Sequence, residues 1–217
     1  ITKIDENKNY KSTDKLNAGI YAVNNNWLIN SIKKIKKAKN GEFLLTDLIQ
    51  IASLEGNQIS SIDFGNTDDA LQVNTDEQLS EVSKLLRFRL FKQLTKKGIQ
   101  IIDWESTFID HTVEIGAKTK ILPNTRIEGL SKIGKNCTIG ANTSVFNAVI
   151  GNDTSIESST IKSSQIGDRV KIGPYSHIRP KSLVMSHVRI GTNVEIKNSI
   201  IGSQTKINHF AYIGDTK

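Results

Sequence analysis

The stretch from Ile133 to Val145, which reads IGKNCTIGANTSV, has an aliphatic residue at every sixth position. These residues are Ile133, Ile139 and Val145, and a glycine directly follows each isoleucine. The small residues Cys137 and Thr143 stand two positions before the next aliphatic residue. A period of six fits neither an α-helix nor an ordinary strand, whose side-chain periods are about 3.6 and 2. It is typical of a hexapeptide β-helix, in which each unit is one short strand and one corner.

The same spacing continues on both sides of this stretch over about a hundred residues. Most steps are six residues long and four are five long, in the series Ile115, Ile121, Ile127, Ile133, Ile139, Val145, Ile150, Ile156, Ile161, Ile166, Ile172, Ile178, Val184, Ile190, Ile196, Ile201, Ile207 and Ile213. We therefore predict a three-sided β-helix from about residue 111 to residue 215, with these side chains inside. Three units would close one coil of about 18 residues, and coils would stack at the strand spacing of about 4.8 Å. The period does not give the hand of the coil.

Small residues recur two positions before many of the aliphatic residues, at Thr119, Thr125, Ser131, Cys137, Thr143, Thr154, Ser176, Ser182, Thr205 and Ala211. We expect these side chains to fill the tight corners of the β-helix. A corner position accounts for the small side chain of Cys137 without any catalytic role. We therefore interpret its thiol as a buried structural group and not as a nucleophile.

A long helix is predicted before the repeats, from about residue 75 to residue 97. The segment 75–78, TDEQ, has the capping-box pattern, with a hydroxyl at the cap and a glutamine three positions on. An apolar stripe follows at Leu79, Val82, Leu86, Leu90 and Leu94, and Gly98 closes the helix. A helix between two regions of different pattern is suited to connect them.

Residues 1–72 are predicted to have mixed α/β structure. Residues 16–23 have the pattern of a buried strand, and a helix is expected from about Trp27 until Gly41 breaks it. Thr46 is expected to cap a second helix that ends at Gly56, before a short strand over residues 59–64. The predicted domains are therefore residues 1–72, a linker helix at 73–98 and the β-helix at 99–217.

Composition gives broader limits. The chain has 217 residues, of which 37% are hydrophobic and 24% charged, with no signal peptide and no apolar run approaching the roughly 18 residues of a membrane span. A single cysteine excludes an internal disulfide and fits a reducing cytosol. The net charge of +7 comes from lysines spread along the chain, and those at 33–39 fit a solvated helix face better than a nucleic-acid site. Because the chain begins with Ile1 and its one methionine is Met185, we expect it to be part of a longer protein.

Short motifs accompany this order of parts. In the first region they are residues 17–21 (NAGIY), 41–47 (GEFLLTD) and 73–74 (VN), and in the repeats they are residues 173–175 (GPY), 178–180 (IRP), 194–198 (VEIKN) and 209–215 (HFAYIGD). Together they resemble the bifunctional N-acetylglucosamine-1-phosphate uridyltransferase and glucosamine-1-phosphate N-acetyltransferase family, and the likeness covers nearly all of the chain. The implied fold is the end of an α/β nucleotidyltransferase domain, then a long helix, then a left-handed hexapeptide β-helix that forms a homotrimer.

The resemblance also implies a function. Enzymes of this family make UDP-N-acetylglucosamine for peptidoglycan synthesis in the bacterial cytoplasm. The second domain would acetylate glucosamine-1-phosphate with acetyl-CoA, and the first would then transfer a uridylyl group from UTP with Mg²⁺ as cofactor. The expected partners are therefore sugar phosphates and nucleotides, with no nucleic acid and no membrane.

Four residues of the repeats are candidates for the acetyl-transfer site. Arg179 and Lys197 each follow an inward isoleucine and are 18 residues apart, so we expect them to stack on one face. Tyr212 precedes the corresponding isoleucine one coil further on, and His209 lies at the corner that leads into that face. Two cations, a phenol and an imidazole on one edge suit a sugar-phosphate site. The resemblance assigns Arg179, Lys197 and Tyr212 to glucosamine-1-phosphate binding and His209 to general-base catalysis, although each alone also fits an exposed surface residue.

In the first region the resemblance assigns Asn17 to the sugar, Asn74 to Mg²⁺ near the nucleotide, and Glu6 to substrate binding across a shorter loop than the family has. Asn17 also fits a strand-edge amide, and Asn74 also fits a residue before a helix cap. The glycine-rich nucleotide loop and the metal-binding aspartate of the family do not occur in this chain. We therefore expect the chain alone to be inactive in both reactions.

Other functions stay open at this point. The chain also fits another sugar-1-phosphate nucleotidyltransferase with a regulatory hexapeptide domain, or a non-catalytic β-solenoid that serves as a scaffold. A zinc enzyme of the hexapeptide type would need three imidazoles in one place. His177 and His187 are ten residues apart on different predicted faces, and neither they nor His111 has an assigned role.

Overall fold

The computed structural model describes residues 17–63 and 67–216, so the predicted substrate residue Glu6 lies outside the described residues. The chain divides into two compact units, residues 1–82 and 83–217, and the division falls inside a long helix. Among the described residues, no helix is long and apolar enough to cross a membrane.

The first unit contains short helices and little sheet. Its elements are α1 (Asn25–Ser31), the 3₁₀ turn η1 (Ile32–Lys34), α2 (Asp47–Leu54) and the 3₁₀ turn η2 (Thr67–Ala70). Asn24 caps α1, since its side-chain oxygen accepts from the backbone N–H groups of Asn26 and Trp27 at 3.0 and 3.2 Å. Thr46 precedes α2 but its hydroxyl makes no capping bond.

Both strands predicted in the first unit are wrong over the described residues. Residues 17–23 and 59–63 form no strand, and Ile20 and Ile62 are 69% and 80% exposed. The first predicted helix is also shorter than expected, because regular structure ends at Lys34 and a lone antiparallel bridge joins Lys37 to Phe43. A strand requires a neighbouring strand for its backbone hydrogen bonds, and these segments have none among the described residues.

The long helix α3 (Asp76–Lys96) has the predicted cap. The Thr75 hydroxyl accepts from the Gln78 backbone N–H at 3.2 Å, and the Gln78 side chain accepts from the Thr75 N–H at 3.2 Å. At its other end Leu94 is buried and Leu90 packs against the core of the second unit, whereas Leu86 is 58% exposed. The predicted stripe is therefore buried only where the helix meets the first coil.

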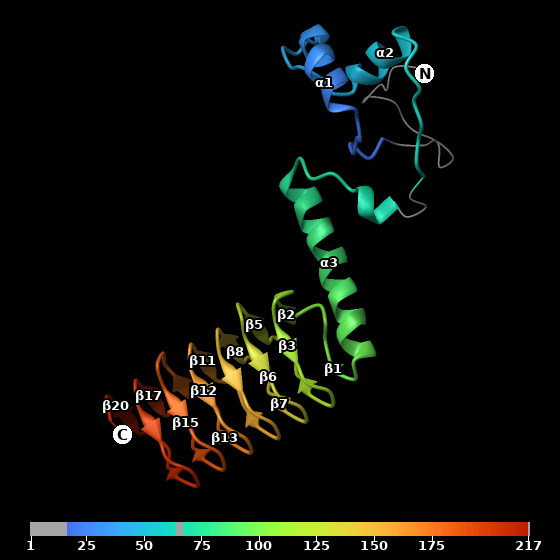
Figure 1. The fold of residues 1–217 in the computed structure, drawn as a ribbon. Coiled ribbons are helices and arrows are strands. Elements are labelled where there is room, and N and C mark those ends of the chain that lie inside the picture. Colours follow the sequence, from blue (N-terminus) through green and yellow to red (C-terminus); the bar gives the residue numbers. More distant parts are fainter. Residues whose placement is uncertain (1–16, 64–66, 217) are drawn as a thin grey trace. The chain divides into compact units, whose positions relative to one another are not determined.

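The rest of the second unit is a β-solenoid of three parallel sheets (Figure 1). The first sheet contains β1 (Gln100–Ile101), β4 (Lys120–Ile121), β7 (Thr138–Ile139), β10 (Ser155–Ile156), β13 (Lys171–Ile172), β16 (Arg189–Ile190) and β19 (Lys206–Ile207). The second contains β2 (Phe108–Ile109), β5 (Arg126–Glu128), β8 (Ser144–Phe146), β11 (Thr160–Lys162), β14 (His177–Ile178), β17 (Glu195–Lys197) and β20 (Tyr212–Gly214). The third contains β3 (Glu114–Ile115), β6 (Lys132–Ile133), β9 (Val149–Ile150), β12 (Gln165–Ile166), β15 (Leu183–Val184) and β18 (Ile200–Ile201). The solenoid is of the left-handed hexapeptide type.

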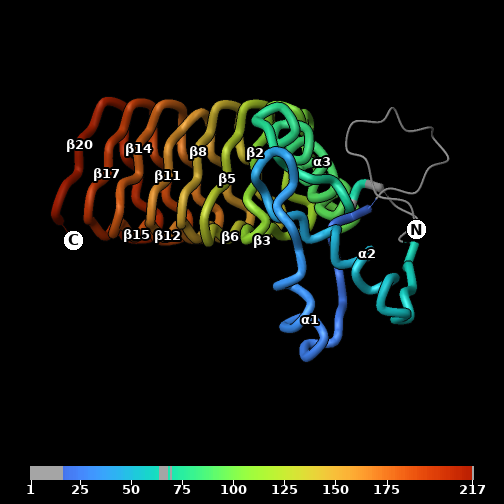
Figure 2. Tube along the Cα trace, turned by 90° about the horizontal axis from the view of Figure 1, so that it is seen from above, coloured from blue at the N-terminus to red at the C-terminus, as the bar shows by residue number. Residues whose placement is uncertain are grey.

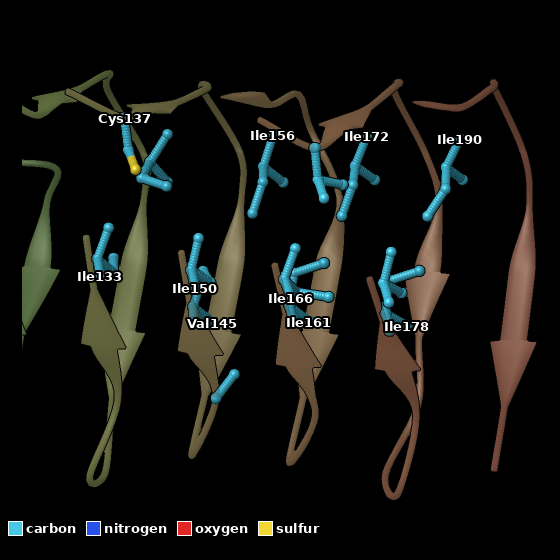
Figure 3. Close-up of a cluster of buried hydrophobic side chains, with 14 of the residues drawn as sticks. Ile133, Cys137, Val145, Ile150, Ile156, Ile161, Ile166, Ile172, Ile178 and Ile190 are labelled. Carbon is cyan, nitrogen blue, oxygen red and sulfur yellow. The ribbon is translucent and has the colours of Figure 1, made fainter. Parts of the chain in front are cut away.

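The coils stack one after another along the solenoid (Figure 2). The core is a column of aliphatic side chains inside them (Figure 3). Each inward residue stacks in register on its counterpart in the next coil, as Ile156 does on Ile172 and Ile172 on Ile190. Ile133, Ile172 and Ile190 are 4%, 1% and 3% exposed, and Ile115 in the first coil is partly buried. The predicted three-sided β-helix is therefore confirmed.

The small residues close the corners by hydrogen bonding between coils. Thr119 Oγ1 donates to the Gly134 carbonyl at 2.8 Å and accepts from the Cys137 backbone N–H at 3.1 Å. Cys137 is buried, its Sγ lies 3.1 Å from the Gly151 carbonyl oxygen, and burial raises the pKa of the thiol. Its structural interpretation is consistent with these contacts, because a thiol kept protonated is a poor nucleophile.

Candidate functional site

The candidate site lies on the outer face of β14, β17 and β20, three successive strands of the second sheet. In this register His177 is opposite Glu195, and Glu195 is opposite Tyr212. Lys197 is opposite Gly214, and the Arg179 N–H donates to the Ile196 carbonyl at 2.8 Å, which places Arg179 beside Lys197. Since residues two apart in a strand share a face, the two rows form one surface.

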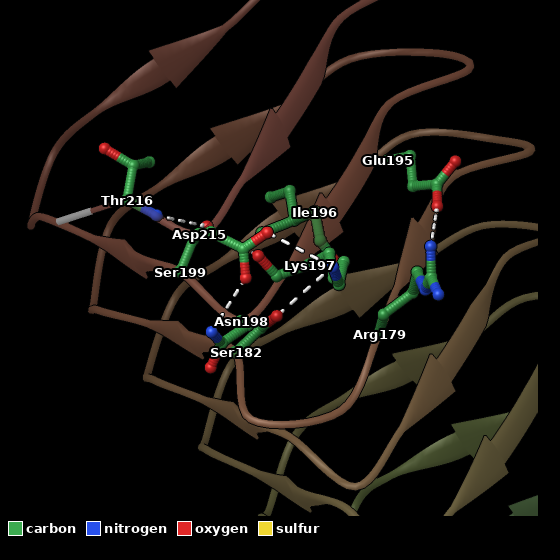
Figure 4. Close-up of polar contacts among 9 residues, drawn as sticks. All are labelled: Arg179, Ser182, Glu195, Ile196, Lys197, Asn198, Ser199, Asp215 and Thr216. Atoms are coloured by element: carbon green, nitrogen blue, oxygen red, sulfur yellow. Dashed lines mark hydrogen bonds and ion pairs between the residues drawn. The ribbon is translucent and has the colours of Figure 1, made fainter.

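Each of the two cations is paired with a carboxylate (Figure 4). Arg179 Nη1 lies 2.7 Å from Glu195 Oε1, and Lys197 Nζ lies 3.1 Å from Asp215 Oδ2. The Asn198 amide donates to Asp215 Oδ1 at 2.9 Å, and this bond, with Lys197, lowers the pKa of Asp215. Glu195 and Asp215 hold the two cations at the surface. A phosphate that binds there would either contact the cations together with these carboxylates or displace the carboxylates from them.

Tyr212 crosses the same face. A Cβ at Gly214 would collide with the Tyr212 hydroxyl, so the absence of a side chain at Gly214 leaves room for the ring to lie along β20. The ring is 62% exposed and thus available to a ligand. This use of Gly214 was missed from the sequence, although the small residue two positions after Tyr212 is its signal.

His209 lies apart from the other three predicted residues, in the turn between β19 and β20. Its imidazole is exposed, and its centroid is 5.9 Å from that of the Phe210 ring with the planes at 86°. Over the described ranges, no hydrogen bond or ion pair joins His209 to Arg179, Lys197 or Tyr212. The structure therefore brings those three onto one face and places His209 at the end where β20 begins.

The chain is similar to known proteins over its whole length and, more narrowly, over the later part of the solenoid. The model of the family described as GlmU-like, C-terminal hexapeptide, matches residues 136–217. The bifunctional protein GlmU of Halalkalibacterium halodurans is 34% identical over all of this chain and 49% of its own length. The GlmU of Acetivibrio thermocellus is 37% identical over 100% and 48%, and that of Geobacillus thermodenitrificans 38% identical over 98% and 47%. Over its whole length the chain is similar to GlmU.

The GlmU-like chain spans about half the length of the curated relatives that it matches. Among solved structures, perosamine N-acetyltransferase from Caulobacter crescentus is 14% identical with a TM-score of 0.39, covering 58% of this chain and 61% of its own.

The structure also reveals a residue of the GlmU-like chain that sequence reasoning left unassigned. His177 stands in the row with Glu195 and Tyr212, and its Nε2 atom is buried without a hydrogen-bond partner among the described residues. Burial lowers the pKa of His177, with Lys162 and Arg179 acting in the same direction and Glu195 opposing them. His187 instead lies at the corner before β16, 3.3 Å from Arg169, and no group of three metal-ligating side chains occurs in the described ranges.

The two asparagines predicted in the first unit make only local contacts. Asn17 donates to the Tyr21 hydroxyl, and its Oδ1 accepts from the Gly19 N–H at 3.0 Å. The Asn74 backbone N–H donates to the Gln78 side chain at 2.8 Å next to the α3 cap. Asn74 therefore has the contacts of a residue before a helix cap, whereas Asn17 lies in no strand among the described residues, so its interpretation as a strand-edge amide is wrong.

Proposed function

We propose that the GlmU-like chain belongs to a bifunctional enzyme of UDP-N-acetylglucosamine synthesis and that its solenoid acetylates glucosamine-1-phosphate with acetyl-CoA. The proposal rests on one observation, that Arg179, Lys197 and Tyr212 lie on the same outer face of the solenoid. Arg179 directly follows β14, Lys197 is in β17 and Tyr212 is in β20. Two cations on adjacent coils suit a dianionic phosphate, and a phenol beside them suits a sugar hydroxyl. Similarity to GlmU over the whole chain supports the same activity.

In this proposal each residue has a separate task. Arg179 and Lys197 bind the phosphate, and Tyr212 orients the sugar ring. His209 accepts the proton of the sugar amine as its nitrogen attacks the acetyl carbonyl, so that a C–N bond forms, the C–S bond breaks and CoA leaves as the thiolate. Histidine suits this task because its ordinary pKa lies near neutrality. Glu195 and Asp215 keep the cations ordered until the phosphate arrives.

Uridylyl transfer from UTP, with Asn17 and Glu6 at the sugar and Asn74 at Mg²⁺, belongs to the same proposal only for the intact enzyme. Mg²⁺ prefers six oxygen ligands, usually including carboxylates, and Asn74 offers one amide. The residues described here do not make a magnesium site by themselves, and their geometry assigns no step of uridylyl transfer. We propose the cytoplasm as its location and cell-wall synthesis as the use of its product.

We further propose that the solenoid works as a homotrimer. From β9 to β18 the outer face of the third sheet is mostly apolar, with Val149, Met185 and Ile200 48%, 40% and 37% exposed, Leu183 beside them and Gln165 the polar exception. The first sheet by contrast carries Lys120, Lys171, Arg189 and Lys206 on its outer face. Such an apolar stretch along one face is suited to a second copy of the chain.

The acetyl-transfer proposal is tested in the intact enzyme. His209→Ala should lower kcat for acetyl transfer by about 10²–10⁴-fold and leave uridylyl transfer almost unchanged. Arg179→Ala should mainly raise KM for glucosamine-1-phosphate, because it binds phosphate in the ground state and the transition state alike. Lys181→Ala removes a neighbouring exposed cation and is the matched control, with KM near wild type. An acetyl-transfer rate within a few-fold of wild type for His209→Ala would remove His209 from the mechanism, and absence of acetyl transfer in the wild-type enzyme would leave the solenoid as a scaffold.

A further inference from the structure

Phe210, like Tyr175, is an aromatic residue of the solenoid that combines an unfavourable backbone conformation with an exposed side chain. Phe210 has φ +56° and its side chain is 78% exposed. Residues other than glycine rarely adopt this left-handed region, and asparagine and aspartate adopt it most readily. Neither the backbone conformation nor burial of the ring therefore explains a phenylalanine at this position.

The equivalent corners show what the fold itself requires there. Each turn from the first sheet to the second has one left-handed residue, and after the first coil these residues are Asn124, Asn142, Ser158, Tyr175, Asn193 and Phe210. Four of the six are asparagine or serine. The turn can thus be made with a small polar residue. Backbone strain that the fold does not need is a reason to look for function.

Phe210 directly contacts the residue that we propose as the general base. The Phe210 and His209 rings meet edge to face, with centroids 5.9 Å apart and planes at 86°. The backbone of this turn is also held closely on the coil before it, because the Phe210 N–H donates to the Thr192 carbonyl at 3.0 Å. A Cβ on Gly191 would lie only 2.9 Å from the His209 backbone nitrogen. The backbone of His209 is therefore fixed, and the Phe210 ring lies against one side of its imidazole.

We propose that Phe210 is a positioning residue for His209, holding the imidazole in the orientation that accepts the proton of the sugar amine. The proposal rests on the general-base role of His209. An exposed imidazole without hydrogen bonds in the described ranges would otherwise rotate between several rotamers. An edge-to-face aromatic contact is strong enough to favour one of them several-fold. The left-handed backbone is retained because it turns the Phe210 ring toward its neighbour.

The decisive variant is Phe210→Asn, measured in the intact enzyme. Asparagine suits the left-handed turn, so the thermal midpoint should stay at or above the wild-type value. The kcat of acetyl transfer should fall about three- to tenfold while KM for glucosamine-1-phosphate is unchanged, because the phosphate contacts lie elsewhere. Phe210→Tyr keeps the ring and should restore kcat. A residue that only stabilises the fold would give the opposite pattern, with lower stability and unchanged kcat.

Two matched exchanges serve as controls. Gln204→Asn changes another exposed left-handed corner residue, and Tyr175→Asn removes the other aromatic of the same corner series. Both should keep wild-type kcat. Wild-type kcat for Phe210→Asn overturns the proposal, as does an equal loss for Tyr175→Asn or a loss that follows dissociation of the assembly. If His209→Ala is itself active, the general-base role on which this inference rests fails; if it is inactive while Phe210→Asn is fully active, only this inference fails.

Discussion

Most corners of the solenoid have a single residue with a left-handed backbone, commonly followed by a small buried one. Asn136 has φ +60° and precedes the buried Cys137, and Asn142 has φ +56° and precedes the buried Thr143. Residues such as Lys118 and Arg169 adopt the same conformation at other corners, at a backbone cost of about 1–2 kcal/mol each. The fold tolerates this cost because the inward aliphatic side chains on both sides of every corner are buried.

His177 is the residue for which the structure predicts a pH dependence of stability. Burial lowers the pKa of its imidazole in the folded chain, so the unfolded chain takes up the proton first as the pH falls. Its contribution to stability is therefore complete above the ordinary histidine value of about 6.5 and is lost as the pH falls through and below it. The variant His177→Gln lacks this titration. Its free energy of unfolding, measured in urea, should decline less than that of the wild type between about pH 7.5 and pH 5.5.

One result of the same measurement would contradict this prediction. Parallel curves for the wild type and His177→Gln over that pH range would show that His177 binds protons equally in both states. Three charged residues face the imidazole, namely Lys162 on β11, Arg179 after β14 and Glu195 on β17. None of the three is mutated in either protein, so that their effect on His177 is the same in both.

At the scale of the strand, glycine after the aliphatic residue allows successive coils to approach closely. A Cβ on Gly134 would lie 2.7 Å from the Asn152 backbone nitrogen and 2.7 Å from the Gly151 carbonyl carbon. Gly202 occupies the same place in the repeat, but within these 217 residues no later coil lies over it, and the nearest atom to its Cβ would be Thr205 Oγ1 at 3.8 Å. Gly134→Ala should therefore lower the free energy of unfolding by about 1–3 kcal/mol, and Gly202→Ala should change it by less than about 0.5 kcal/mol.

Equilibrium denaturation of the two variants provides the measurement. Equal losses for both would mean that glycine acts through chain flexibility and not through the spacing of coils. The comparison is matched, because both residues follow the inward residue of a third-sheet strand, β6 in one case and β18 in the other.

In the first unit, the local sequence pattern predicts strands that the structure does not have in the described ranges. Ile20 and Ile62 lie in segments with strand-like sequence, yet neither segment forms a strand in the described ranges. The cap of α3 was predictable because Thr75 and Gln78 bond to each other's backbone three residues apart. Strands differ from helices in this respect, since their hydrogen bonds come from another segment of the chain.

At the scale of the molecule, the three faces of the solenoid differ in chemistry. The third sheet exposes Val149, Met185 and Ile200, and we propose it as the face between copies. Placing lysine at both Val149 and Ile200 should convert the trimer to monomer in sedimentation velocity, with the circular dichroism of the β-helix retained. Thr138→Lys adds a charge to the outer face of the first sheet and should leave the trimer intact. An unchanged mass for the double variant would assign assembly to another face.

The period of six residues by itself determined which side chains are inside and which residues share a column. This is possible because each strand stacks on the strand one coil later, so a rule of spacing along the chain is also a rule of contact. The same rule predicts Arg179 and Lys197 on one face, and in the structure they lie beside each other on adjacent coils.

Only the tertiary structure decided how those outward side chains pair. Arg179 pairs with Glu195 and Lys197 with Asp215, Tyr212 lies over Gly214, and the Nε2 atom of His177 is buried. The five-residue step from Ile196 to Ile201 shortens one coil and moves Tyr212 opposite Glu195. Spacing specifies the column of a residue, but the rotamer of an exposed side chain depends on partners from adjacent coils, which a one-dimensional period does not contain.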